Sequence, residues 1–394
     1  MNQLHLIQYA PVSTAAWFYM FAAWAFLYCG GVTAWLLLGV GPKEPRVVLG
    51  IQPIRKALIY VTLLAAIGVI DQIRVVSSRF GGVIQAIVFN AGEIYLERTA
   101  NELSWLPYLG SVLYVACVLA AVYAIQTGSW RLASCPIILI VLTSLFSMSR
   151  GGLTVFGPFV LIPCLYTPRP VRTVVTKRTK VMAVAAAVLA IGVFFAVNSL
   201  RGLETDFPGR TDAIDSISAY MPDFPSIYSN FSAEPVAFSI YLDKSGSQTG
   251  EFFGRYTFAP AFRLAARLGF PTKVPTYEEN YYTPVPMNIG TYLKNVYSDF
   301  GIGGIVLFPF FLGAICTTLH LNLQRSWDIR TLLILTHLYV YIIFSILTSF
   351  TVSGEWYISL ISSVLLGTIL RQKVNALVCE TADKQVVPPP LIAT

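Results

Sequence analysis

The sequence predicts an all-α fold, a polytopic bundle of transmembrane helices. Of its 394 residues, 55% are hydrophobic and only 12% are charged, whereas a soluble domain carries roughly 25% charged residues. Apolar stretches recur between residues 15 and 370, and a helix of about 20 apolar residues crosses the hydrocarbon core of a bilayer. These observations exclude an ordinary water-soluble enzyme and favour one helical bundle in lipid.

The apolar stretches predict nine spans and four regions. We expect the spans at residues 15–40, 57–76, 105–126, 132–148, 152–167, 181–199, 302–321, 331–350 and 356–370. The regions are six spans within residues 1–199, one large loop at 200–301, three spans within 302–370, and a tail at 371–394. The first stretch is too long for the core of a signal peptide, which predicts a retained helix.

Three shorter features connect or flank these spans. Residues 149–152 predict a tight outer turn between the fourth and fifth spans, and residues 77–104 predict an amphipathic helix on the outer face. Asp71 and Arg74 are three residues apart on the second span, so we expect them to pair with each other.

The net charge of +7 reflects membrane topology rather than nucleic-acid binding, because the basic residues lie in short loops and form no single face. Residues 41–56 and 168–180 carry nine cations, and other loops and the tail on that side carry six more. Only four lie near the short loops of the opposite side. The excess marks the cytoplasm and places the N-terminus and the large loop outside.

Within the large loop, residues 259–270 predict a short helix. Pro260 suits the first helical position, Gly269 suits the C-terminal cap, and Pro271 prevents continuation. Arg263 and Arg267 are four residues apart and share one face of this helix. Two guanidinium groups on one face require an anionic partner or water.

Residues 277–304 carry the most informative pattern. An asparagine is followed by a small residue, an aromatic residue, a basic residue and a second aromatic residue, and then by Asp-Phe-Gly just before a predicted span. The positions are Asn288, Thr291, Tyr292, Leu293, Lys294, Tyr297, Asp299, Phe300, Gly301 and Gly304. This pattern resembles the bacterial oligosaccharide repeat-unit polymerases, the O-antigen polymerase family called Wzy. Residues 254–260 and the Ser-Arg-Gly-Gly turn at 149–152 also look like that family.

The resemblance implies a GT-C-like membrane glycosyltransferase of the bacterial inner membrane. It would transfer the growing glycan from undecaprenyl pyrophosphate to the nonreducing end of a new lipid-linked repeat unit, on the periplasmic side. The product would be a surface polysaccharide such as O-antigen or exopolysaccharide. The implied partners are the lipid-linked oligosaccharide, membrane lipid and a chain-length regulator in the same membrane. No cofactor is implied.

The chemistry of this reaction suggests roles for particular residues. Guanidinium and ammonium groups stabilise a pyrophosphate leaving group, and the candidates are Arg150, Arg201, Arg255, Arg263 and Lys294. Arg150 is also a predicted catalytic residue, together with Asp299 as acceptor of the hydroxyl proton. The candidates for glycan contacts are Asn288, Tyr292 and Tyr297.

Each assignment has a structural alternative. The arginines could cap helix ends, contact lipid headgroups or lie on a solvated face. Asp299 could cap the N-terminus of the helix that follows, and the tyrosines could belong to the aromatic belt of a membrane protein. The three histidines show no ligand spacing, so no metal site is predicted.

Two other enzyme or transport functions remain open. An O-antigen ligase has a similar topology, but its family pattern places a histidine beside the asparagine, whereas Met287 precedes Asn288 and the large loop contains no histidine. A transporter or flippase would need polar residues at the midplane and discontinuous helices in two corresponding halves. A noncatalytic scaffold leaves the dispersed outer arginines without a role.

Overall fold

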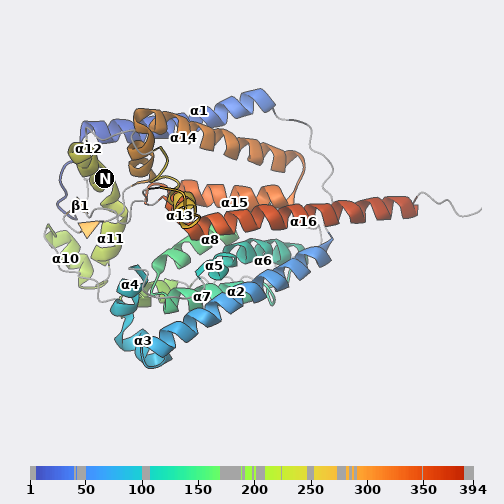
Figure 1. Ribbon diagram of the computed structural model, residues 1–394, viewed down its shortest axis with the longest axis horizontal. Helices are drawn as coiled ribbons and strands as arrows, with labels where there is room; N and C mark the ends of the chain where they lie inside the picture. The colour runs from blue at the N-terminus through green and yellow to red at the C-terminus, as the bar shows by residue number, and fades with distance from the viewer. Residues whose placement is uncertain are drawn as a thin grey trace, which may run out of the picture.

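A computed structural model describes residues 6–39, 41, 50–99, 107–168, 188, 191–197, 199–200, 209–222, 224–245, 253–272, 281–283, 286–287, 291–347 and 349–385. This part of the chain is predominantly helical, as the sequence predicts (Figure 1). Its only strands are β1 (Tyr281–Tyr282) and β2 (Pro286–Met287), which form an antiparallel pair with Tyr281 opposite Met287.

The helices fall into three groups along the chain. The first is α1 (Thr14–Leu38), α2 (Ile51–Arg79), α3 (Val83–Phe89), α4 (Ala91–Thr99), α5 (Pro107–Ser111), α6 (Leu113–Thr127), α7 (Ser134–Phe146) and α8 (Arg150–Tyr166). The large loop contains α10 (Asp212–Ser218), α11 (Phe224–Ser232), α12 (Glu234–Ser245) and α13 (Ala259–Arg267). The last is α14 (Tyr292–Arg325), α15 (Ile329–Phe344), the 3-10 helix η2 (Phe350–Val352) and α16 (Gly354–Gln385).

Four segments of the described chain are long and apolar enough to cross a membrane: α1, α2, the stretch Tyr108–Thr127 and α14. Helices α7, α8 and α15 are apolar but shorter, and the 13 residues of α7 extend only about 20 Å. The predicted spans coincide with described helices except the sixth, residues 181–199, which lies largely outside the described residues. A membrane protein is therefore supported, while nine crossings stay a prediction.

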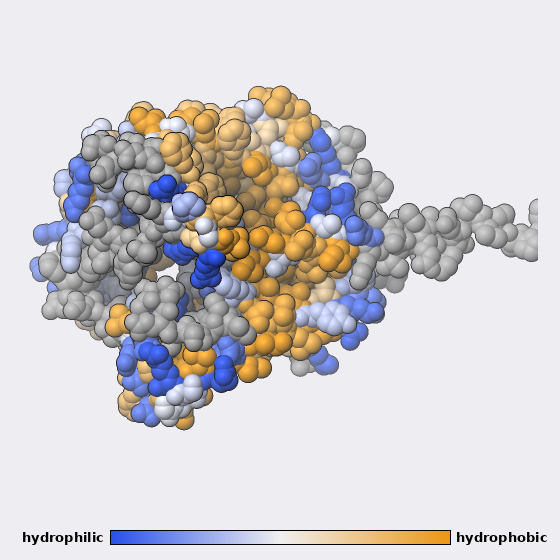
Figure 2. Space-filling model, viewed as in Figure 1, coloured by the Kyte–Doolittle hydropathy of each residue, from blue (hydrophilic) through white to orange (hydrophobic). Residues whose placement is uncertain are grey.

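The long helices run across an apolar band with hydrophilic residues at both ends (Figure 2). The N-terminus, α3, α4 and α10–α12 gather at one end, which we call the outer end, and α16 leaves the bundle at the opposite end (Figure 1). The elements predicted to lie outside therefore share one end of the molecule.

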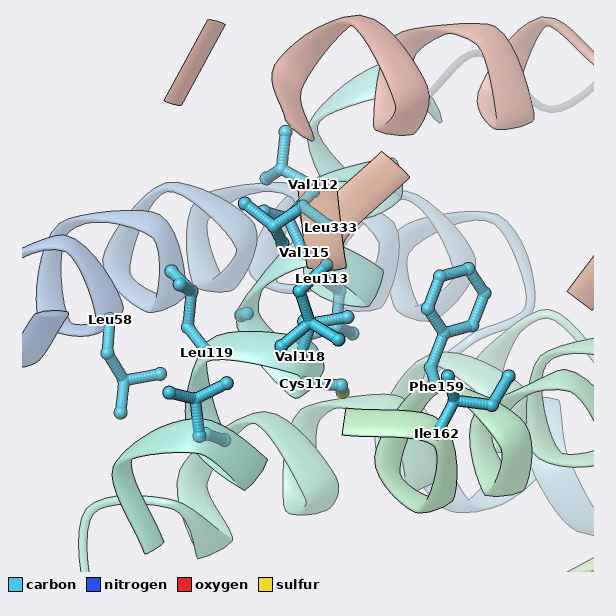
Figure 3. Close-up of a cluster of buried hydrophobic side chains, with 14 of the residues drawn as sticks. Leu58, Val112, Leu113, Val115, Cys117, Val118, Leu119, Phe159, Ile162 and Leu333 are labelled. Atoms are coloured by element: carbon cyan, nitrogen blue, oxygen red, sulfur yellow. The ribbon is translucent and has the colours of Figure 1, made fainter. Parts of the chain in front are cut away.

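The centre of the bundle is α6, which is buried along most of its length. Side chains from α2, α8 and α15 pack around it, among them Leu58, Phe159 and Leu333 (Figure 3). Cys117 is fully buried in this cluster. A helix that is apolar on all sides and enclosed by neighbours is expected in the interior of a membrane bundle.

Helix α1 contacts the bundle mainly through α14, by close approach of the two backbones. A Cβ atom added at Gly30 would lie 1.9 Å from the Phe310 carbonyl oxygen, and one added at Gly313 would lie 1.9 Å from the Leu27 carbonyl oxygen. Small residues let membrane helices approach closely and gain dispersion contacts. The rest of α1 is exposed and bulky, with Trp24 70% exposed, as expected of a lipid-facing surface.

Three predicted boundaries differ from the structure. The predicted amphipathic helix at 77–104 is interrupted, because Gly81 and Gly82 with positive φ separate α2 from α3 and Asn90 separates α3 from α4. Helix α14 begins ten residues before the predicted span and breaks at Gly301, where φ is 58° and ψ is −144°. The predicted tail at 371–394 is helical as far as Gln385, since α16 continues through Arg371.

Gly30→Ala and Gly313→Ala should each destabilise the contact between α1 and α14, because the added Cβ overlaps a backbone carbonyl that cannot rotate away. We expect a loss of about 1–3 kcal/mol, measured as a lower thermal midpoint in detergent. The control is Gly157→Ala in α8, where an added Cβ meets nothing within 4 Å. Equal stability of all three variants would contradict the packing described here.

Candidate functional site

Asp299 connects the large loop to α14. Its carboxylate is 1% exposed and accepts the Tyr256 N–H at 3.1 Å and the Thr257 N–H at 2.5 Å. The carboxylate therefore caps the N-terminal turn of a different segment, where unpaired N–H groups favour an anion. The alternative that Asp299 caps the helix after the Gly301 break is wrong, because both carboxylate oxygens accept N–H groups of the 253–258 turn.

The segment that Asp299 holds is the turn at residues 253–258, which leads into α13. Phe253 and Gly254 have φ of 46° and 89°, and the Phe258 N–H donates to the Gly254 carbonyl at 2.7 Å. Positive φ suits glycine, and a Cβ at Gly254 would also crowd the Phe258 ring at 3.1 Å. This turn carries Arg255, whose side chain is half-buried.

Helix α13 follows the turn as the sequence predicts. It runs from Ala259 to Arg267, with Pro260 in its first turn and Gly269 at φ of 90° after its end. The Phe270 N–H donates to the Ala265 carbonyl at 3.1 Å, and together with the bond from Gly269 to Ala266 this forms a Schellman cap. Arg263 is exposed on this helix. Helix α13 packs against η2 at the outer end of the bundle.

Lys294 lies one and a half turns before Asp299 on α14, but its side chain faces an aromatic pair. The ammonium is buried, 4.8 Å from the centre of the Tyr281 ring and 6.0 Å from that of Tyr241. The Tyr241 and Ser298 hydroxyls are 2.5 Å apart, and Ser298 donates to the Lys294 carbonyl. Cation–π contacts of this kind stabilise a desolvated ammonium, so Lys294 also ties β1 and α12 to α14.

The predicted glycan residues Tyr292 and Tyr297 occupy different environments. Tyr292 is buried, and its ring packs against Phe308 and Tyr341 at centroid distances of 5.9 and 6.0 Å. Tyr297 is half-buried, and its ring lies 5.3 Å from that of Tyr19 on α1. Of the two, Tyr297 has the more accessible ring.

The structure describes the other predicted residues only in part. Arg150 is the first residue of α8, directly after the turn at Ser147–Ser149, but its side chain lies outside what the structure describes. Arg201 and Asn288 lie outside the described residues. The predicted pairing of Asp71 with Arg74 is confirmed by a contact of 2.7 Å.

Two charged residues at the outer end, Arg98 of α4 and Glu355 of α16, have no predicted role in the chemistry. The Glu355 side chain is exposed, yet protein surrounds it closely enough that restricted hydration raises the pKa of its carboxyl, while the positive charge of Arg98 lowers it. Burial conversely lowers the pKa of Arg98, and Glu355 raises it. Figure 2 shows a hollow bordered by strongly hydrophilic residues at this end of the molecule.

Two tyrosines, Tyr108 and Tyr114, lie in the region of Glu355 and the Ser-Arg-Gly-Gly turn. The Tyr114 phenol of α6 interacts electrostatically with both Glu355 and Arg98. A Cβ atom at Gly152 would lie 3.7 Å from the Tyr114 hydroxyl, and one at Gly354 would lie 3.4 Å from the Tyr108 ring. The sequence signal was available: Glu355 is the only acidic residue between residues 329 and 370.

Comparisons of the chain with known protein families, with characterised proteins and with solved structures found no match. The geometry of the outer end is therefore the basis for any functional assignment.

Asp299→Asn should loosen the turn at residues 253–258. An amide presents one acceptor oxygen and one NH2 group to two N–H donors, so one charge-assisted hydrogen bond is lost at a cost of about 1.5–3 kcal/mol. We expect faster hydrogen exchange at the Tyr256 and Thr257 amides and a lower thermal midpoint.

The matched control for this substitution is Asp243→Asn on α12, because Asp243 is exposed. It should leave both measurements unchanged. Unaltered exchange at residues 256 and 257 in the Asp299 variant would show that the carboxylate does not hold the turn.

Proposed function

We propose that the protein polymerises lipid-linked oligosaccharide repeat units. It would transfer the growing glycan from undecaprenyl pyrophosphate to the nonreducing end of a new lipid-linked unit, in the synthesis of a surface polysaccharide. The reaction would take place at the outer end, on the periplasmic side of a bacterial inner membrane. A chain-length regulator in the same membrane is a proposed partner.

One observation carries this proposal. The two loop stretches that resemble the polymerase family, residues 254–260 and 288–304, are far apart in sequence, yet Asp299 joins them through the amides of Tyr256 and Thr257. The third stretch, residues 149–152, lies at the same end beside Tyr114. Segments that share no helix are thus gathered where the apolar band meets the polar outer region, which suits a substrate with a lipid tail and a polar glycan.

The proposed chemistry assigns the cations to the leaving group. When the glycosidic bond to the pyrophosphate breaks, negative charge accumulates on the phosphate oxygens, and arginine forks stabilise it through paired hydrogen bonds. Arg255 is half-buried on a turn fixed by Asp299, so its position is less free than that of the exposed Arg263. We therefore propose Arg255 as the main described cation of the site, with Arg150 and Arg201 as further candidates.

Lys294 and Asp299 have a positioning role in this proposal. Lys294 is buried against Tyr281 and Tyr241, and both oxygens of Asp299 accept backbone N–H groups. Direct contact of either group with substrate would require these interactions to open. Tyr297, with its accessible ring, is the proposed glycan contact among the described tyrosines.

The decisive experiment uses the purified protein in lipid nanodiscs with a lipid-linked repeat unit. A ladder of products on a gel supports polymerisation. Transfer only to lipid A core, with no ladder, would support the ligase, and movement of the intact lipid-linked unit across the bilayer without a new glycosidic bond would support a flippase.

Arg255→Ala and Arg150→Ala should each reduce the rate of ladder formation by about 10²–10³-fold, because a preorganised charge on the leaving group is lost. Arg255→Lys should recover part of the activity, since an ammonium keeps the charge but cannot form the planar paired contact. The control is Arg74→Ala, whose side chain is 73% exposed. Full activity in an alanine variant would remove that arginine from the site.

Polymerisation should persist in excess EDTA, since we assign neutralisation of the pyrophosphate to arginine rather than to a divalent cation. Among the residues that the structure describes, no group of three or more His, Cys, Asp or Glu side chains is placed to hold a metal ion. Loss of turnover on chelation, restored by magnesium or manganese, would overturn the arginine mechanism.

The proposed orientation can be tested with single cysteines in a variant that lacks the native ones. Ser216 on α10 is exposed and is predicted to lie on the outer side of the membrane. Ser134 at the start of α7 is half-buried and is predicted to lie on the cytoplasmic side. A membrane-impermeant maleimide applied to the outer face of the inner membrane should label Ser216→Cys and spare Ser134→Cys. The reverse result would invert the assignment.

A further inference from the structure

Polymerisation requires an acceptor for the proton of the attacking hydroxyl, and Asp299 is poorly placed for this task. Its carboxylate is buried, and both oxygens already accept backbone N–H groups. A general base must come within hydrogen-bond reach of the hydroxyl that it deprotonates. The outer end therefore needs a carboxylate that substrate can reach.

Glu355 meets this requirement. It lies in the first turn of α16, directly after η2, and its side chain is exposed at the outer end. Helix α13, which follows the turn bearing Arg255, packs against η2. Gly354, the residue before Glu355, lies near the Tyr108 ring of α5, and Gly152 of the Ser-Arg-Gly-Gly turn lies near the Tyr114 hydroxyl of α6. Two of the three segments that the proposed function uses therefore lie near elements that contact the start of α16.

Arg98 provides Glu355 with a nearby positive charge. Its guanidinium stacks on the Tyr95 ring at 5.6 Å, and the interaction between Arg98 and Glu355 favours the charged form of both groups. The Arg98 Nε atom is buried and has no hydrogen-bond partner among the described residues.

We propose that Glu355 is the general base of the reaction and that Arg98 is a positioning residue beside it; this inference rests on the proposed function. In the step, the acceptor hydroxyl oxygen forms a bond to the anomeric carbon of the growing glycan. The bond from that carbon to the pyrophosphate oxygen breaks, and undecaprenyl pyrophosphate leaves with the electron pair. The hydroxyl proton passes to a Glu355 carboxylate oxygen.

The other groups near Glu355 do not supply an alternative base. Among the described residues of the elements packed against it, the titratable neighbours are Tyr108 of α5, Tyr114 of α6, Tyr341 of α15 and Tyr357 of α16 itself. These side chains are phenols, and none of them is a carboxylate. Arg98 is the neighbouring charged group that acts on Glu355.

The pH dependence of the rate separates this role from a structural one. A base must be deprotonated, so the rate falls when the pH drops below the pKa of Glu355. Burial raises that pKa, and the positive charge of Arg98 opposes the rise. Arg98→Gln should therefore move the acidic limb of the profile to higher pH, whereas Arg98→Lys, which keeps the charge, should move it much less.

The experiment measures ladder formation from acidic to neutral pH for the wild type and the variants in nanodiscs. Glu355→Gln should lose about 10²–10⁴-fold in rate while binding the lipid-linked repeat unit as the wild type does, and Glu355→Asp should recover part of the rate. Thermal midpoints equal to that of the wild type establish that the variants fold. Glu93→Gln, an exposed carboxylate on α4, is the matched control and should keep full activity.

Three results would overturn the inference. A Glu355→Gln rate within about threefold of the wild type, against the 10²–10⁴-fold expected for general base catalysis, refutes Glu355 as the base while leaving polymerisation intact. An acidic limb that stays in place in Arg98→Gln refutes the role of Arg98. Absence of a ladder from the wild-type protein refutes the proposed function itself, and with it the base.

Discussion

The outer end of the protein depends on one buried carboxylate. Asp299 accepts two backbone N–H groups of the turn at residues 253–258. These two hydrogen bonds connect the turn to α14. Because the carboxylate is shielded from water, its charge is satisfied only by these donors and by the positive end of the turn. This link fixes the turn that bears Arg255 and leads into α13.

A division of labour among the carboxylates follows from burial. A carboxylate that holds a backbone turn must stay in place, whereas a base must reach the hydroxyl that it deprotonates at each turnover. Asp299 is enclosed and Glu355 is accessible, so the two requirements fall on different residues. The same distinction separates Lys294, which is stacked on Tyr281, from Arg255, which lies on the half-open turn.

Local sequence signals predicted the features that local physics determines. Hydropathy located the long helices, Pro260 and Gly269 bounded α13, and the spacing of Asp71 and Arg74 gave their ion pair. Contacts between distant residues were beyond such signals. Asp-Phe-Gly before an apolar run resembles a helix start, and only the packed structure shows that α14 begins earlier and that Asp299 caps another segment. The electrostatic interaction between Arg98 and Glu355 likewise depends on the three-dimensional arrangement of α4 and α16.

The contact between α1 and α14 has a consequence for biogenesis. Helix α1 ends at Leu38, while its main partner begins at Tyr292. At a synthesis rate of about 5–20 residues per second, α1 waits in the bilayer for roughly 13–50 s before α14 emerges. During that interval Gly30 and its small neighbours face lipid, and the bulky surface bearing Trp24 keeps the helix inserted. Another membrane helix with small residues at matching spacing could bind this surface of α1 first. Correct assembly therefore requires that the surface stay unoccupied until α14 is inserted.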